Sequence, residues 1–222
     1  MAFKAFMTGA AAAVSMLAWG GAASADMRFS LTTIGGSCGA RCPQAIVADG
    51  EISDSTPDEF LSFVRANSRS GDLRSVVLLN SPGGKVVASM ELGRMFRKVG
   101  AATVVARAVS DGDGRSHLTS GRCFSACVYA LMGGRKRVVP AQSLVGIHRM
   151  FALEAGADPA GGGGGARRRF DNGDMRGVLS RYSEAMGVSR DLINTAERTP
   201  TESIHVLSPS EVARWRLGSS RF

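Results

Sequence analysis

Three short segments carry the residue types that acyl transfer by a serine requires. The first is the turn Asn80-Ser81-Pro82-Gly83-Gly84, directly after the apolar residues 76–79. The second, residues 121–127, holds Ser125 before an apolar run, and the third ends at His148 after residues 144–147. Backbone N–H groups, a hydroxyl and an imidazole can serve as oxyanion donors, nucleophile and general base. The ordered trio therefore predicts a site for nucleophilic hydrolysis.

The glycine turn and the segment after Ser125 are both suited to binding a developing negative charge. Proline fixes φ in the turn, whereas Gly83 and Gly84 allow positive φ and a close backbone approach. We expect Ser125 at the start of a buried helix over residues 123–132, where the N–H of Ala126 and the helix dipole favour an oxyanion. Singly, these features are a common turn, a helix cap and a core histidine. Only their conjunction favours catalysis.

The elements that must position these residues alternate along the chain. We expect strands at residues 45–52, 73–79, 103–109, 137–139 and 144–147, and loops at 111–121 and 155–165. We expect helices from Ser55 to about Ser68 and at residues 86–99, 123–132, 170–186, 189–198 and 209–217. Strands that alternate with helices predict an α/β fold with parallel strands.

The N-terminal residues are typical of a secretory signal peptide. Lys4 precedes an apolar stretch through Trp19, and the small residues Ala23-Ser24-Ala25 follow. The alternative is a retained membrane anchor, but the apolar core is short against the roughly 20 residues of a bilayer span. We therefore expect residues 1–25 to be cleaved after Ala25 and the protein to be periplasmic or secreted. Residues 26–44 are expected to form an irregular arm with two cysteines, and residues 45–222 one domain.

Four cysteines remain after cleavage: Cys38, Cys42, Cys123 and Cys127. In an oxidising compartment an even count favours disulfides, with three connectivities open. The C-x3-C spacings and the histidine positions do not fit zinc, so no metal site is expected. A bond between Cys123 and Cys127 would span one helical turn, whereas a bond from the arm would pin the N-terminus over the serine. Buried free thiols beside a tight turn are the alternative.

The formal net charge of +8 comes mostly from arginine, including residues 167–169 after the five glycines 161–165. A basic balance can favour nucleic acid or an anionic surface. No aromatic residues interleave with the arginines and no DNA-binding motif is present. A solvated basic face is therefore favoured, and no nucleic-acid partner is expected.

In order, and nearly in spacing, the three motifs resemble those of the Clp protease proteolytic subunit. Proteins of that type carry an N-S-P-G-G turn, a G-x-A-A-S-M-G serine and an M-I-H histidine. Within this ClpP/crotonase-like superfamily the chain is most similar to exported, uncharacterised bacterial members with a Cys-x-Ser-Ala-Cys motif. The resemblance extends from about Ala45 to Leu217 and implies a crotonase-like (ClpP-type) ββα spiral. It also implies Ser125 as nucleophile, His148 as base, and Ala126 with Gly83 or Gly84 as oxyanion donors.

The chain departs from that pattern at the third member of a triad. The aspartate of the pattern falls on Ile204, and Glu202 lies two residues away. A triad with Glu202, a Ser–His dyad and an inactive site therefore all stay open. Related signal peptide peptidases use a Ser–Lys dyad, for which Lys85 and Lys136 are the candidates, but the histidine is preferred.

These observations predict an exported serine hydrolase, a peptidase acting on peptide or protein substrates without a cofactor. A homo-oligomer is compatible with the resemblance. An ATPase partner is not expected, because an exported protein has no ATP available. The alternatives are a catalytically silent binding module in the periplasm and an acyl-CoA enzyme, the latter disfavoured by export.

Overall fold

The computed structural model describes residues 25–34, 44–67, 76–110, 116–154, 167–170 and 173–221 of the chain. The strands are β1 (Arg28–Thr33), β2 (Gln44–Asp49), β3 (Val76–Asn80), β4 (Ala102–Ser110), β5 (Ser116–Ser120), β6 (Arg122–Phe124), β7 (Lys136–Val138), β8 (Leu144–Ile147), β9 (Phe151–Glu154), β10 (Arg167–Phe170) and β11 (His205–Val206). The helices are α1 (Thr56–Asn67), α2 (Val86–Lys98), α3 (Cys127–Met132), α4 (Asp174–Ala185), α5 (Asp191–Arg198) and α6 (Pro209–Arg214).

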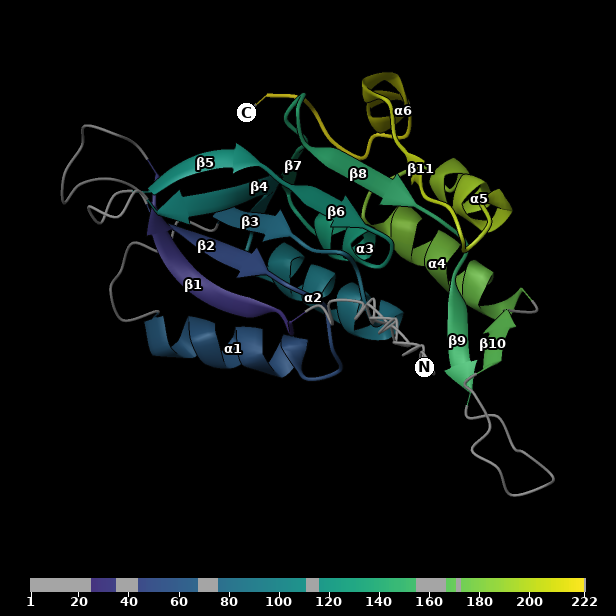
Figure 1. Cartoon of the computed structure of the whole chain (residues 1–222), viewed down its shortest axis with the longest axis horizontal. Coiled ribbons are helices and arrows are strands. Elements are labelled where there is room, and N and C mark those ends of the chain that lie inside the picture. The colour runs from purple at the N-terminus through teal and green to yellow at the C-terminus, as the bar shows by residue number, and fades with distance from the viewer. Residues whose placement is uncertain are drawn as a thin grey trace, which may run out of the picture.

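The main sheet has the order β1-β2-β3-β4-β5, with β7 also paired to β4, and a smaller sheet has the order β11-β8-β6 (Figure 1). Strands β2, β3, β4 and β7 are parallel. Their apolar runs are buried, as is typical of parallel strands covered on both faces. Strand β6 is parallel to β8 in the smaller sheet. The predicted α/β class with parallel strands is confirmed.

The core includes buried residues of both sheets and of helices α1, α2 and α3, which Figure 1 shows below the strands, and it continues to α4, α5 and α6. Phe60 of α1 and Phe96 of α2 are buried and meet edge to face, with ring centroids 5.0 Å apart. Helix α2 begins two residues after Gly84 and ends before Gly100, which has a φ of +73°. The helix that must follow the glycine turn is thus held against the core by its apolar face.

The expectation of an irregular arm was wrong for residues 28–33. They form β1, which pairs antiparallel with β2 over its whole length. Phe29 and Leu31 pack against the core while Arg28 and Ser30 are exposed, so the segment follows the two-residue period of a half-buried strand. Residues 35–43, with Cys38 and Cys42, lie outside the described residues.

Two further boundaries differ from expectation. Residues 116–120 form β5 rather than a loop, because their backbone pairs antiparallel with residues 106–110 of β4, a pairing that needs no apolar pattern. The expected helix at 170–186 begins only at Asp174, because Phe170 belongs to β10 and Gly173 has a φ of +115°.

The predicted signal peptide falls on residues 1–24, outside the described ranges, and Ala25. None of the helices in the described part of the chain is both long and apolar enough to cross a membrane.

Candidate active site

Ser125 occupies a turn between a strand and a helix, not the start of a helix as expected. Strand β6 ends at Phe124, Ser125 has a φ of +54°, and α3 begins at Cys127. Only one other non-glycine residue in the described part of the chain, Arg216, has positive φ. A serine in the left-handed region costs about 1–3 kcal/mol and persists only where its surroundings enforce it. Such strain is frequent at nucleophiles carried on strand-to-helix turns.

The histidine strand fixes one side of this turn. The N–H of Ser125 donates to the carbonyl of Gly146 at 2.8 Å, continuing the parallel pairing of β6 with β8. On the other side, the N–H of Val128 donates to the carbonyl of Ser125 at 3.2 Å, which starts α3. The turn is therefore hydrogen-bonded to the strand before it and the helix after it.

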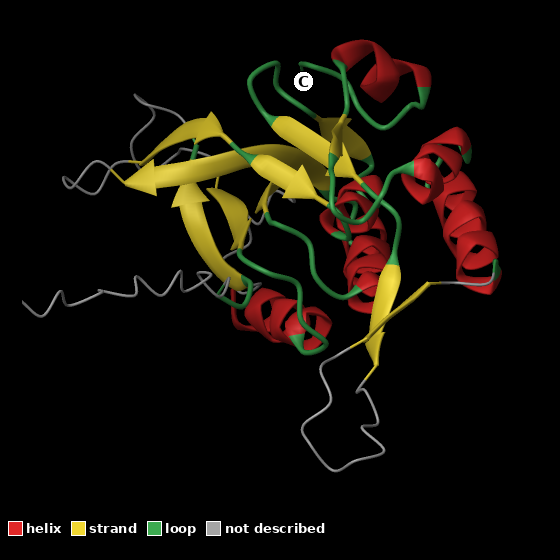
Figure 2. Cartoon of the chain, turned by 45° about the vertical axis from the view of Figure 1, so that its right-hand side comes forward, coloured by secondary structure: helices red, strands yellow, loops and turns green. Residues whose placement is uncertain are grey.

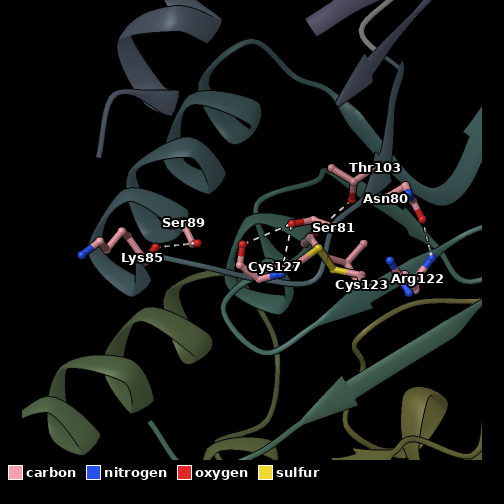
Figure 3. Close-up of a disulfide and its surroundings, with 10 residues drawn as sticks. Asn80, Ser81, Lys85, Ser89, Thr103, Arg122, Cys123 and Cys127 are labelled. Atoms are coloured by element: carbon pink, nitrogen blue, oxygen red, sulfur yellow. Dashed lines mark hydrogen bonds between the residues drawn. A yellow bond between two sulfur atoms is a disulfide. The ribbon is translucent and has the colours of Figure 1, made fainter. Parts of the chain in front are cut away.

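A disulfide joins Cys123 and Cys127 across the turn (Figure 3), with Cα atoms 5.3 Å apart. Both residues are fully buried. The bond runs from a strand to a helix, so the expectation that it would span one helical turn was wrong. The Cα separation lies well inside the usual range for disulfides. The alternative in which the N-terminal arm bonds to the serine segment is excluded, since both cysteines of that segment are used.

The conformation of the glycine turn is set by Asn80 and Ser81. The Nδ2 of Asn80 lies 3.2 Å from both carboxylate oxygens of Asp49, while its Oδ1 accepts from the N–H of Arg122 at 3.0 Å (Figure 3). Ser81 pairs with β6 through two hydrogen bonds. Its N–H donates to the carbonyl of Arg122 at 2.8 Å, and its carbonyl accepts from the N–H of Phe124 at 3.1 Å. The polar residues before the glycines therefore attach the turn to the serine strand.

Gly83 lies directly against the turn that carries Ser125. It has a φ of +114°, and a Cβ at this position would meet the Ser125 Cβ at 2.9 Å and the Ala126 nitrogen at 3.2 Å. Its N–H already donates to the Ser81 Oγ at 3.1 Å. Among the hydrogen bonds of the described residues, the N–H groups of Gly84 and Ala126 have no acceptor. Of the three expected oxyanion donors, these two are thus available and Gly83 is not.

His148 follows the last residue of β8 and is half-buried. Its Nδ1 lies 2.8 Å from the carbonyl oxygen of Arg149. Because a carbonyl can only accept, a hydrogen bond here requires the proton on Nδ1, which leaves a lone pair on Nε2. Ser125 and His148 thus follow the carboxyl ends of two adjacent parallel strands, although no hydrogen bond joins the two side chains themselves. Catalytic hydrogen bonds are often loose in the absence of substrate.

Ser125 and His148 line the same cavity, which has a volume of about 640 Å³. Its apolar wall includes Val86, Val87, Met150, Phe151, Phe170, Met175 and Ile204, and Glu51, Asp54, Lys85 and Arg169 supply charges. The volume is that of a site for a small molecule or a short peptide segment. Lys85 is exposed and lies 3.9 Å from the Asp54 carboxylate. Lys136, the other lysine considered as a base, belongs to β7 and does not line this cavity.

The structure does not bring Glu202 to His148. The Glu202 carboxylate lies 2.7 Å from both the Thr201 hydroxyl and the Arg168 guanidinium. These contacts, the Thr201 hydrogen bond first, lower the pKa of Glu202 below its usual range. In the part of the chain that is described, no carboxylate bonds to His148. Ile204, where the resemblance places an aspartate, lines the cavity as an apolar residue. A catalytic role for Glu202 stays a prediction.

Sequence reasoning missed the hairpin β9–β10, which Figure 2 shows extending from the body of the molecule. Arg168, one of the arginines predicted to lie on a solvated face, contacts an aromatic ring here, and so does Arg149. The Arg168 guanidinium lies 4.9 Å from the Phe151 ring centre, and that of Arg149 lies 4.7 Å from the Phe170 ring centre. Both phenylalanines line the cavity. The sequence feature that could have predicted this hairpin is the presence of an apolar residue on each side of the glycine-rich segment.

The fold of the chain is similar to that of several solved structures. A mutant of the 1510-N membrane-bound stomatin-specific protease superposes with a TM-score of 0.53 at 15% identity, covering 80% of this chain and 79% of that one. A second mutant of that protease, in complex with a substrate peptide, superposes with a TM-score of 0.52 at 16% identity, covering 80% of this chain and 74% of that one. A mutant of ClpP1 from Listeria monocytogenes superposes with a TM-score of 0.50 at 17% identity, covering 78% of this chain and 88% of that one.

The chain has a ClpP-like fold. This confirms the fold that the resemblance implied. No protein-family model and no curated protein sequence matches the chain. At such low identity the likeness concerns the ClpP-like fold alone, so the chemistry must be argued from the residues of this chain.

Proposed function

We propose that the protein is a serine hydrolase, specifically a peptidase, with Ser125 as nucleophile and His148 as general base. The observation that carries the proposal is the strained turn of Ser125, which is hydrogen-bonded directly to the strand that precedes His148 and lines the same cavity as His148. A serine with a purely structural role gains nothing from a left-handed conformation. A nucleophile gains exposure of its hydroxyl in a fixed direction.

In the proposed reaction the Oγ of Ser125 attacks the carbonyl carbon of the substrate while its proton passes to the Nε2 of His148. The oxygen that becomes negative is bound by the N–H groups of Gly84 and Ala126. His148 then gives the proton to the leaving amine. Water next attacks the acyl-enzyme while His148 takes its proton, and His148 returns that proton to the Oγ of Ser125 as the acid product leaves. The Arg149 carbonyl, which accepts from Nδ1, holds the ring in the required tautomer, so the catalytic set is a dyad.

A peptide substrate is supported by the cavity and by the neighbours, one of which was solved with a substrate peptide. We further propose that the protein is exported by residues 1–25 and acts without an ATPase. The buried disulfide beside Ser125 supports an oxidising compartment.

The test is reaction of the purified mature protein with a fluorophosphonate probe, which modifies activated serines. The wild type should be labelled at a single site, found by peptide mass spectrometry at Ser125. Ser125→Ala should not be labelled, and Ser55→Ala, which removes an exposed hydroxyl outside the cavity, should react like the wild type. Equal labelling of Ser125→Ala would refute the assignment.

The second candidate is a binding module that keeps the site without catalysis. It is favoured by one observation, that His148 has no carboxylate partner in the described residues. This alternative predicts no labelling of the wild type together with peptide binding that cavity substitutions such as Phe151→Ala weaken. Labelling at Ser125 would exclude it.

A further inference from the structure

We propose that the Cys123–Cys127 disulfide is a positioning element of the active site, which holds Ser125 in its left-handed conformation so that the hydrolase is efficient only when oxidised. The inference rests on the proposed function of Ser125 and deepens it. The fold as a whole does not require this disulfide, because the bond closes a ring over only one turn.

The disulfide encloses only Phe124, Ser125 and Ala126. Two of these three residues supply proposed catalytic groups, the nucleophile hydroxyl and the N–H of Ala126. A single covalent bond therefore constrains both the attacking atom and one donor to the oxyanion. Its ends lie on different elements, β6 and α3, so the bond also fixes the angle at which the helix leaves the strand.

The turn has few other means of enforcing positive φ. Glycine is the residue that adopts this region without strain, and neither neighbour of Ser125 is a glycine. The backbone hydrogen bonds from Ser125 to Gly146 and from Val128 to Ser125 hold the two ends of the turn. Relaxation of Ser125 to negative φ would change the direction of its hydroxyl relative to the cavity that it lines together with His148. The covalent link opposes that relaxation.

The burial of the disulfide indicates a permanent constraint and not a surface switch. Cys123 and Cys127 have 0% exposure and belong to the main core cluster. Two thiols form this bond by passing two electrons and two protons to a disulfide-containing oxidant, which becomes a dithiol. We infer that this oxidation accompanies folding in the oxidising compartment and completes the site.

The test compares the rate of fluorophosphonate labelling of the wild type with that of the double variant Cys123→Ala/Cys127→Ala. We expect the rate to fall about tenfold or more, as the cost of a strained conformation that is no longer enforced implies. Each single variant should match the double variant, because each removes the same bond. With a peptide substrate, the factor by which kcat falls should be larger than the factor by which KM rises.

Val212→Ala is the control for general destabilisation, since it truncates a buried side chain in α6, outside the cavity lining. All rates are measured well below the melting temperature of each variant. The proposal would be overturned if the double variant were labelled at close to the wild-type rate. It would also be overturned if the double variant and Val212→Ala were labelled at the same rate. A wild type that is not labelled at all would instead refute the proposed function.

If the double variant does not fold, the native sequence provides the same comparison. Reduced, denatured protein is refolded with or without oxidised glutathione and then labelled. The oxidant is converted to two molecules of glutathione for each disulfide formed. Masses after alkylation report the state of Cys123 and Cys127. Oxidation should raise the labelling rate about tenfold, and an unchanged rate would contradict the proposal.

Discussion

The N–H of Ser125 donates a 2.8 Å hydrogen bond to the carbonyl of Gly146, two residues before His148. The bond extends the parallel pairing of β6 and β8 by one residue past the end of β6. It places the proposed nucleophile and base at the ends of adjacent strands without a hydrogen bond between their side chains. The site is thereby built from backbone pairing, and substitutions that disturb this pairing or the groups packed on it are expected to affect labelling of Ser125.

Gly83→Ala should nearly abolish labelling of Ser125. The added methyl group would lie 2.8 Å from the Phe124 oxygen and 2.9 Å from the Ser125 Cβ, at a φ of +114°. Gly100→Ala is the matched control, with a φ of +73° and nothing within 4 Å of its added Cβ. In denaturant unfolding, Gly100→Ala should lose about 1–2 kcal/mol of stability from its left-handed backbone. Gly83→Ala should lose more, because its Cβ also meets the Phe124 oxygen. Comparable labelling of the two variants would contradict a close approach of the turn to the nucleophile.

His148→Ala should reduce peptide turnover about as much as Ser125→Ala, because residues that act as one unit have strongly non-additive effects. Lys85→Ala tests the lysine alternative, since Lys85 lines the same cavity and is exposed. We expect that variant to keep turnover within about threefold of the wild type. A His148→Ala enzyme with near-normal turnover would show that another group is the base.

Glu202→Gln should leave the labelling rate within about twofold of the wild type, because its carboxylate is exposed and contacts Arg168 and Thr201 instead of His148. An acidic member of a triad is worth far more than this, so the measurement distinguishes a dyad from a triad. A loss of a hundredfold or more would establish Glu202 as the third member. Thr201→Val, which removes one contact of the same carboxylate, serves as the control.

Glu211→Gln should destabilise the protein at neutral pH by about 1–2 kcal/mol through loss of the cap of α6. Burial alone would raise the pKa of Glu211, but hydrogen bonds from the backbone and side chain of Ser208 and from His205 lower it from 4.5 to about 2. A lowered folded-state pKa stabilises above pH 4.5, and the contribution is lost as the pH falls from 4.5 towards 2. The stability difference between wild type and variant should therefore shrink across that window in urea unfolding.

Arg137→Gln should lower the stability by about 1.5–3 kcal/mol while leaving labelling of Ser125 unchanged. Arg137 and Arg97 both donate to the carbonyls of Met132, Gly134 and Met186, near the C-terminal ends of α3 and α4. Burial first, then neighbouring arginines, lowers the pKa of both groups. Carbonyls at helix ends favour cations, which compensates this cost. An unchanged melting temperature would show that these bonds contribute nothing.

The sequence was informative where local patterns and chemistry coincide. Strand β8 has the predicted bounds of residues 144–147, and α2 is one residue shorter than predicted at its C-terminal end. The capping box of α6, formed by Ser208 and by Glu211 three residues later, depends on neighbours in the chain alone. The edge strand β5 was missed because its residues have no apolar pattern, and β1 because only Phe29 and Leu31 mark its buried face.

By itself the sequence determined the motifs around Gly83, Ser125 and His148, the alternation that produces the parallel sheet, and the presence of cysteines on both sides of the serine. Only the tertiary structure decided that Ser125 lies in a left-handed turn, that Cys123 bonds to Cys127, that the N–H of Gly83 is occupied, and that Glu202 contacts Arg168. The physical reason is the range of the interactions. Apolar periodicity and turn chemistry are properties of adjacent residues, whereas a strained φ, a free N–H and the partner of a carboxylate depend on which distant segments the folded chain brings together.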